Sequence, residues 1–165
     1  MQNALARVLS RIDLAWFLID HGRATDAMQM AALALQSVPP KVTTSWTGPH
    51  QQVLEVLVWA HLLASPNAAL AEHWDAYDQA LRNGFAGGRK LLFHEADRAL
   101  VAQSLQDASL LASARNGVKE AMSIVAQRPA MLCQQPLATQ RPNWRRLQQD
   151  GRRRILTELG VCGPA

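Results

Sequence analysis

Residues 12–40 read IDLAWFLIDHGRATDAMQMAALALQSVPP, and this stretch decides the fold. Apolar residues recur at steps of three and four on its N-terminal side, which predicts an amphipathic helix over residues 2–20. Gly22 follows at the point where a chain leaving a helix often needs a left-handed residue. A second helix is predicted over residues 24–38, lined by alanines and stopped by two prolines that cannot continue it. The stretch therefore predicts two antiparallel helices that pack closely.

This hairpin resembles one unit of the tetratricopeptide repeat, a helix–turn–helix of about 34 residues. The residues that carry the resemblance are Leu14, Ala15, Gly22, Ala27, Ala34 and Pro39. Arg11 and Leu18 depart from it, because the pattern prefers tryptophan and tyrosine there, and Ala31 stands where a larger residue is common. The resemblance implies that further hairpins stack on the first and that the first helix of each pair lines a concave groove for a partner.

The rest of the chain repeats this pattern only faintly, so an irregular helical bundle is the alternative to an α-solenoid-like array. Further helices are predicted over residues 51–64, 66–83, 89–105, 108–114, 118–126 and 144–159. The connections between them include a loop from Pro39 to His50 and a turn at Asn116–Gly117. No sustained strand alternation interrupts this pattern. We therefore predict an all-α fold of seven to eight helices in antiparallel hairpins.

Three regions follow from composition and charge. Residues 1–127 form the helical body, residues 128–143 contain three prolines and form a linker, and residues 144–165 form a basic C-terminal helix and tail. The net charge of +4 comes from the linker and this last part together, since residues 127–165 hold seven arginines against two acidic residues. The basic character is therefore local, and it marks the C-terminal helix as the candidate contact for an anionic partner.

Compartment and membrane association are constrained by cysteine usage and hydropathy. Two cysteines in 165 residues are typical of a reducing compartment, although Cys133 and Cys162 could form one disulfide. The N-terminal apolar stretch is interrupted by charged residues, so it lacks the core of a signal peptide. The longest apolar run, residues 54–64, is too short to span a bilayer. We expect a cytoplasmic protein without a membrane span.

No motif for catalysis or cofactor binding is present in the chain. The glycine-rich stretch at 84–88 fails as a phosphate-binding loop, because Arg89 stands at the required second glycine and Leu91 at the required hydroxyl. The five histidines include no His-x-x-x-His pair, and the cysteines lack CxxC spacing. A composite metal site from distant residues is one alternative, and solvated histidines explain the same residues more simply. We predict a non-catalytic protein with no metal and no cofactor.

Two kinds of partner fit what remains. The first is a protein, bound as a peptide or helix by an adaptor or chaperone-like module. The residues predicted to contact it are Asn3, Arg11, Leu18 and Trp46. The second is a nucleic acid, bound by an accessory protein through the basic C-terminal helix, because guanidinium groups bind phosphate well. The residues predicted for that contact are Arg145, Arg146, Arg152, Arg153 and Arg154. A homodimer is compatible with either partner.

Overall fold

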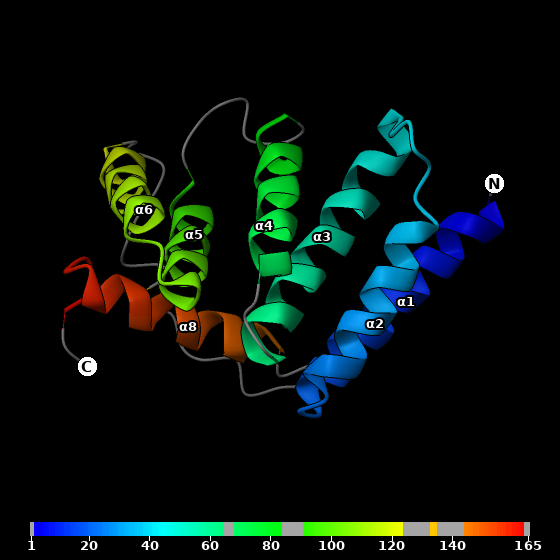
Figure 1. The fold of residues 1–165 in the computed structure, drawn as a ribbon, viewed down its shortest axis with the longest axis horizontal. Coiled ribbons are helices and arrows are strands. Elements are labelled where there is room, and N and C mark those ends of the chain that lie inside the picture. The colour runs from blue at the N-terminus through cyan, green and yellow to red at the C-terminus, as the bar shows by residue number, and fades with distance from the viewer. Residues whose placement is uncertain (1, 65–67, 84–90, 124–132, 135–143, 164–165) are drawn as a thin grey trace. The chain divides into compact units, whose positions relative to one another are not determined.

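The computed structural model describes residues 2–64, 68–83, 91–123, 133–134 and 144–163. Within these ranges every regular element is helical, which confirms the predicted all-α fold class. Figure 1 shows the helices, which are α1 (Gln2–Asp20), α2 (Ala24–Gln36), α3 (Thr44–Ala64), α4 (Ala68–Leu81), α5 (Leu92–Leu105), α6 (Ala108–Met122) and α8 (Trp144–Glu158).

The chain divides into two compact units, Met1–Gly87 and Gly88–Ala165. In the first unit α1 contacts α2 and α3, α2 contacts α3, and α3 contacts α4. In the second unit α5 contacts both α6 and α8. Helices α3 and α5 are therefore the central helices of their units. The predicted region boundaries near residues 127 and 143 fall outside the described residues.

The first hairpin forms as its sequence predicts. Gly22 has a φ of +73°, a left-handed conformation that glycine adopts at little cost. The amide of Arg23 donates to the carbonyl of Leu18 at 2.8 Å, and the amide of Gly22 donates to that of Ile19 at 3.1 Å. These two bonds satisfy carbonyls that the end of α1 would leave without partners. On α2 the alanines at 27, 31 and 34 are completely buried, so their small side chains allow α1 and α2 to approach closely.

Helix α3 begins seven residues earlier than predicted. We expected a loop from Pro39 to His50 and a helix from Gln51, but the helix starts at Thr44 and contains Pro49. The extra turns are stabilised at one end by the amide of Trp46, which donates to the carbonyl of Thr43 at 2.9 Å. The Trp46 side chain is 5% exposed, so burial of its large apolar surface favours the helix over the loop. Between Val53 and His61 every side chain except Glu55 is also buried.

Helix α6 corrects another predicted boundary. Asn116–Gly117 is not a turn, because α6 runs without interruption from Ala108 to Met122. Gly117 is buried, and a Cβ atom at this position would overlap the carboxylate of Glu95 on α5. Glycine is thus required for a close approach between helices here. The predicted break before Ala108 is confirmed, because α5 ends at Leu105, Gln106 adopts a left-handed conformation and Asp107 caps α6.

The second unit also contains the C-terminal helix and a disulfide. Helix α8 begins and ends within one residue of its prediction, and its apolar residues Ile155 and Leu156 are buried. Cys133 and Cys162 form a disulfide with a Cα–Cα distance of 5.5 Å, which answers the open question of their pairing. Disulfides persist mainly in oxidising environments. The pairing therefore gives no support to a cytoplasmic location, which stays a prediction.

Candidate functional site

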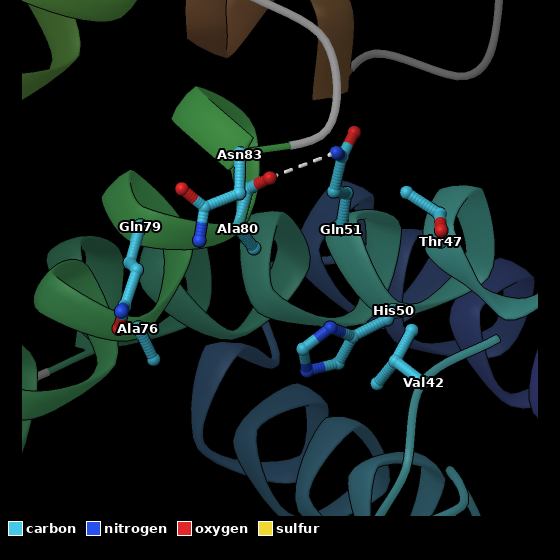
Figure 2. Close-up of a pocket in the computed structure, with 8 residues that line it drawn as sticks. All are labelled: Val42, Thr47, His50, Gln51, Ala76, Gln79, Ala80 and Asn83. Carbon is cyan, nitrogen blue, oxygen red and sulfur yellow. Dashed lines mark hydrogen bonds between the residues drawn. The ribbon is translucent and has the colours of Figure 1, made fainter. Parts of the chain in front are cut away.

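A pocket of about 430 Å³ lies between α3, α4 and the segment that leads into α3. Figure 2 shows its lining, which consists of Val42, Thr47, His50, Gln51, Ala76, Gln79, Ala80 and Asn83. Ligand pockets in proteins typically measure about 300–1,000 Å³, so this one is large enough to hold a small molecule or a short segment of chain. All of its lining residues belong to the first unit.

Helical periodicity brings these side chains to one place. Thr47, His50 and Gln51 are spaced at three and four residues, so they share one face of α3. The residues from α4 and its end repeat the same spacing, with alanines at 76 and 80 and amides at 79 and 83. The alanines leave room between the helices because their side chains are short. The longer polar side chains line the edges of this space.

The polar lining is neutral and rich in carboxamides. The side chains of Gln51, Gln79 and Asn83 each carry an amide donor and a carbonyl acceptor. Gln51 donates from Nε2 to the main-chain oxygen of Ala80 at 3.1 Å, which holds its side chain across the pocket from α3 to α4. Lysine, arginine, aspartate and glutamate do not occur among the described lining residues. The pocket therefore offers hydrogen bonds without a fixed charge.

His50 is the titratable residue of the described lining. Partial burial lowers the pKa of its imidazole from the ordinary value, because burial disfavours the charged form. At neutral pH the ring is therefore uncharged, with one nitrogen that donates a hydrogen bond and one that accepts. His50 adds one more neutral donor and acceptor to the amides around it.

The residues predicted to contact a protein partner separate into two pairs. Asn3 and Arg11 come together in a shallow hollow on α1, which they line with Ala6, Arg7 and Ser10. Arg11 is anchored to the neighbouring helix end, since its guanidinium donates to Ser37 Oγ at 2.9 Å and to the Leu33 carbonyl at 3.2 Å.

Leu18 and Trp46 are instead packed inside the chain, with 8% and 5% of their surface exposed. Neither residue lines the pocket between α3 and α4.

The predicted arginine cluster on α8 is largely engaged in contacts within the second unit. Arg152 donates two hydrogen bonds of 2.8 Å to Asp97 on α5. Arg154 donates to Gln103 Oε1 at 2.8 Å and to Glu158 Oε1 at 3.1 Å.

The other three predicted arginines differ in their surroundings. Arg146 is half exposed and lies 4.0 Å from Asp150, and Arg153 is partly buried. The side chain of Arg145 lies outside the described residues.

The pocket residues were not predicted from the sequence. Gln79 on α4 and Asn83 just after it are four residues apart, which is also the spacing of polar residues on any solvated helix face. Thr47 and His50 were assigned to a loop. The alternation of alanines and amides over residues 76–83 is the one sequence signal for a polar pocket. The sequence around α3 does not indicate which of its residues face that pocket.

A second cluster involves two histidines of the first unit. The rings of His61 on α3 and His73 on α4 lie 4.8 Å apart between centroids. Burial lowers the pKa of both imidazoles, and for His61 the neighbouring His73 adds to the effect. In the described part of the chain no three metal-ligating side chains come together.

Comparisons with known protein families, curated proteins and solved structures gave no match to this chain. Among the described helices, none is both long and apolar enough to cross a membrane. The function must therefore be argued from the geometry of the two units, and above all from the pocket between α3 and α4.

Proposed function

We propose that this chain is a non-catalytic protein-interaction module, of an adaptor or chaperone-like kind, that holds a peptide or helix of a partner protein on α1–α4. The single observation that carries the proposal is the pocket between α3 and α4, which presents neutral hydrogen-bonding groups beside short apolar side chains. Such a lining suits a polypeptide, whose main chain offers uncharged donors and acceptors in alternation.

The arrangement of the first unit also supports the proposal. Helix α1 contacts α2 and α3, and α3 contacts α4, which are the neighbour relations expected of two stacked hairpins. Together with the tetratricopeptide-like pattern of residues 12–40, these contacts favour a repeat-like interaction scaffold. A helical-repeat interpretation of the first unit is thus part of the proposal.

A catalytic role has less support. Acid–base catalysis generally needs a titratable group held by an oriented partner. In the described lining His50 has no carboxylate beside it. Binding is accordingly the activity that this set of side chains favours.

The nucleic-acid alternative has weaker support than the protein-binding one. Arg152 and Arg154 each pair with an acidic side chain of the same chain, so phosphate would have to compete with those partners. Arg146 and Arg154 are each about half exposed, and each lies within 4.0 Å of an acidic residue on α8.

Site-specific photo-crosslinking in the native cell tests the proposal. A benzophenone side chain at Gln79, which is exposed in the lining, is expected to capture a discrete protein. The matched control carries the same side chain at Gln36, which is exposed on α2 and does not line the pocket. Nuclease treatment before recovery distinguishes the alternative partner. Recovery of protein from position 36 alone, or of nucleic acid alone, would contradict the proposal.

A further inference from the structure

We infer that the pocket between α3 and α4 selects an uncharged, extended segment of polypeptide and binds it more tightly while His50 is neutral. The inference rests on the proposed function, because it names the ligand class and the control of the same site. It identifies the partner by chemistry: a stretch rich in small and carboxamide side chains, with no acidic or basic residue in the pocket.

The selection against charge follows from the lining. A charged ligand group that enters the pocket loses water, and this loss is costly unless an opposite charge or several hydrogen bonds replace it. The charges of Asp78 on α4 and Arg82 just after it are of little help, because the two side chains form an ion pair with each other at 3.0 Å and do not line the pocket. A ligand with neutral amide groups has no charge to desolvate, and its donors and acceptors can pair with the amides of the lining.

The preference for an extended segment follows from the same groups. Gln51 comes from α3, Gln79 from α4 and Asn83 from the residues just after α4, so their donors and acceptors line the pocket from two sides. A helical segment has already used its main-chain groups internally, whereas an extended segment presents them to a binding surface. Ala76 and Ala80 leave space for small side chains beside that main chain.

Control by His50 follows from its place in the lining and from the charges around it. The charged or titratable residues on the helices packed against α3, on the segment that leads into α3 and just after α4 are Arg7, Arg11, Asp13, Asp20, Asp26, Lys41, Glu72, His73, Asp75, Tyr77, Asp78 and Arg82. None of them lines the pocket, and burial is the cause of the lowered pKa of His50. A bound segment removes more water from the ring, so it disfavours the imidazolium further. Acidification should therefore release the segment.

Fluorescence anisotropy with three pools of labelled hexapeptides, blocked at both ends, tests the inference on the full chain. One pool contains only Ala, Gly, Ser, Asn and Gln, while the others add Glu or Lys. At about pH 7.5 the uncharged pool should bind about tenfold more tightly than either charged pool. Its affinity should fall about threefold or more by about pH 5.5.

Four variants locate the effect. His50→Gln should remove the pH dependence, whatever affinity it retains near neutrality, whereas His21→Gln, at an exposed residue just after α1, should keep both the affinity and its pH dependence. Gln79→Glu should weaken binding of the uncharged pool, whereas Gln36→Glu, with the same added charge on α2, should not.

Equal binding of all pools, or a pH dependence that survives His50→Gln, would overturn the inference. Its failure is distinguishable from that of the proposed function. A protein captured at Gln79 without binding of the uncharged pool would leave the interaction module standing and remove the ligand class. Binding of that pool without any captured protein would support the pocket chemistry and remove the adaptor role.

Discussion

Arg152 on α8 donates two parallel hydrogen bonds, each 2.8 Å long, to the two carboxylate oxygens of Asp97 on α5. The Asp97 side chain is fully buried and that of Arg152 is 14% exposed. The guanidinium carbon also lies 5.3 Å from the centre of the Phe93 ring, a favourable cation–π position. This pair therefore joins α5 to α8 and explains why an arginine-rich helix can be structural.

Replacement of Asp97 should destabilise the second unit. In Asp97→Ala the guanidinium of Arg152 loses its buried partner, and breaking such a pair costs about 3 kcal/mol or more. The free energy of unfolding from urea titration measures the loss. The double variant Asp97→Leu/Arg152→Met should recover much of it, because apolar residues of similar size often replace a buried pair without penalty. An Asp97→Ala variant as stable as the parent would contradict a structural role.

Gly117 and its neighbour Asn116 should respond oppositely to alanine. Asn116→Ala should stabilise the protein by about 0.5 kcal/mol, since Asn116 is exposed in α6 and alanine has the higher helix propensity. Gly117→Ala should instead destabilise it by about 1–3 kcal/mol, because the new methyl group meets Glu95. Thermal or urea unfolding measures both values. If Glu95→Ala makes Gly117→Ala less costly in the double variant, the close contact is the cause.

Reduction of the disulfide should lower stability as well. The bond closes a loop with a sequence separation of 29. The loss of chain entropy in the unfolded state for such a loop corresponds to about 3–4 kcal/mol. Urea unfolding with and without a thiol reductant measures the difference, and a Cys133→Ser/Cys162→Ala variant provides the control that no longer responds to reductant. Equal stability of the oxidised and reduced protein would show that the bond adds no constraint.

Acid should destabilise the first unit through its buried histidines. Burial lowers the pKa of His61 and His73 from the ordinary value of 6.5 in the native state. Below about pH 6.5 the unfolded chain therefore binds protons that the native chain rejects, and the free energy of unfolding falls as the pH falls. Above that pH both states are neutral and stability is unaffected by these groups.

Urea titrations between about pH 7.5 and pH 5 measure this slope. His61→Leu should make this slope shallower, because one of the two imidazoles that resist protonation in the native state is then absent. His21→Gln, at an exposed residue outside this histidine pair, provides the matched control. A stability that rises on acidification over this range would contradict the proposed linkage.

Elements governed by local rules were predictable. Helices α1 and α8 begin and end within one residue of their predictions, because apolar periodicity and terminal glycines operate over a few neighbouring residues. Gly22 adopts the left-handed conformation expected after a helix. The buried alanines of α2 were likewise visible as one face of a helical wheel.

Elements governed by distant contacts were not predictable. Gly117 has the local signature of a turn, yet it lies inside α6, where the lack of a side chain leaves room for Glu95 of α5. Trp46 sits in a stretch of threonines, glycine and proline, yet its burial favours a helix over a loop. In both cases a packing contact outweighs local propensity.

The pocket between α3 and α4 and the arginine-rich helix α8 also combine features that the sequence predicts with features that it does not. The sequence alone determined an all-α chain, a hairpin over residues 12–40 and a C-terminal helix crowded with arginines, since each depends on the order of adjacent residues. Only the tertiary structure decided that Arg152 binds Asp97, 55 residues away, and that Gln51 joins Gln79 in one pocket. The physical reason is that hydrogen bonding and burial depend on which helices come together in space, and the sequence periodicity of one helix contains no record of its neighbours.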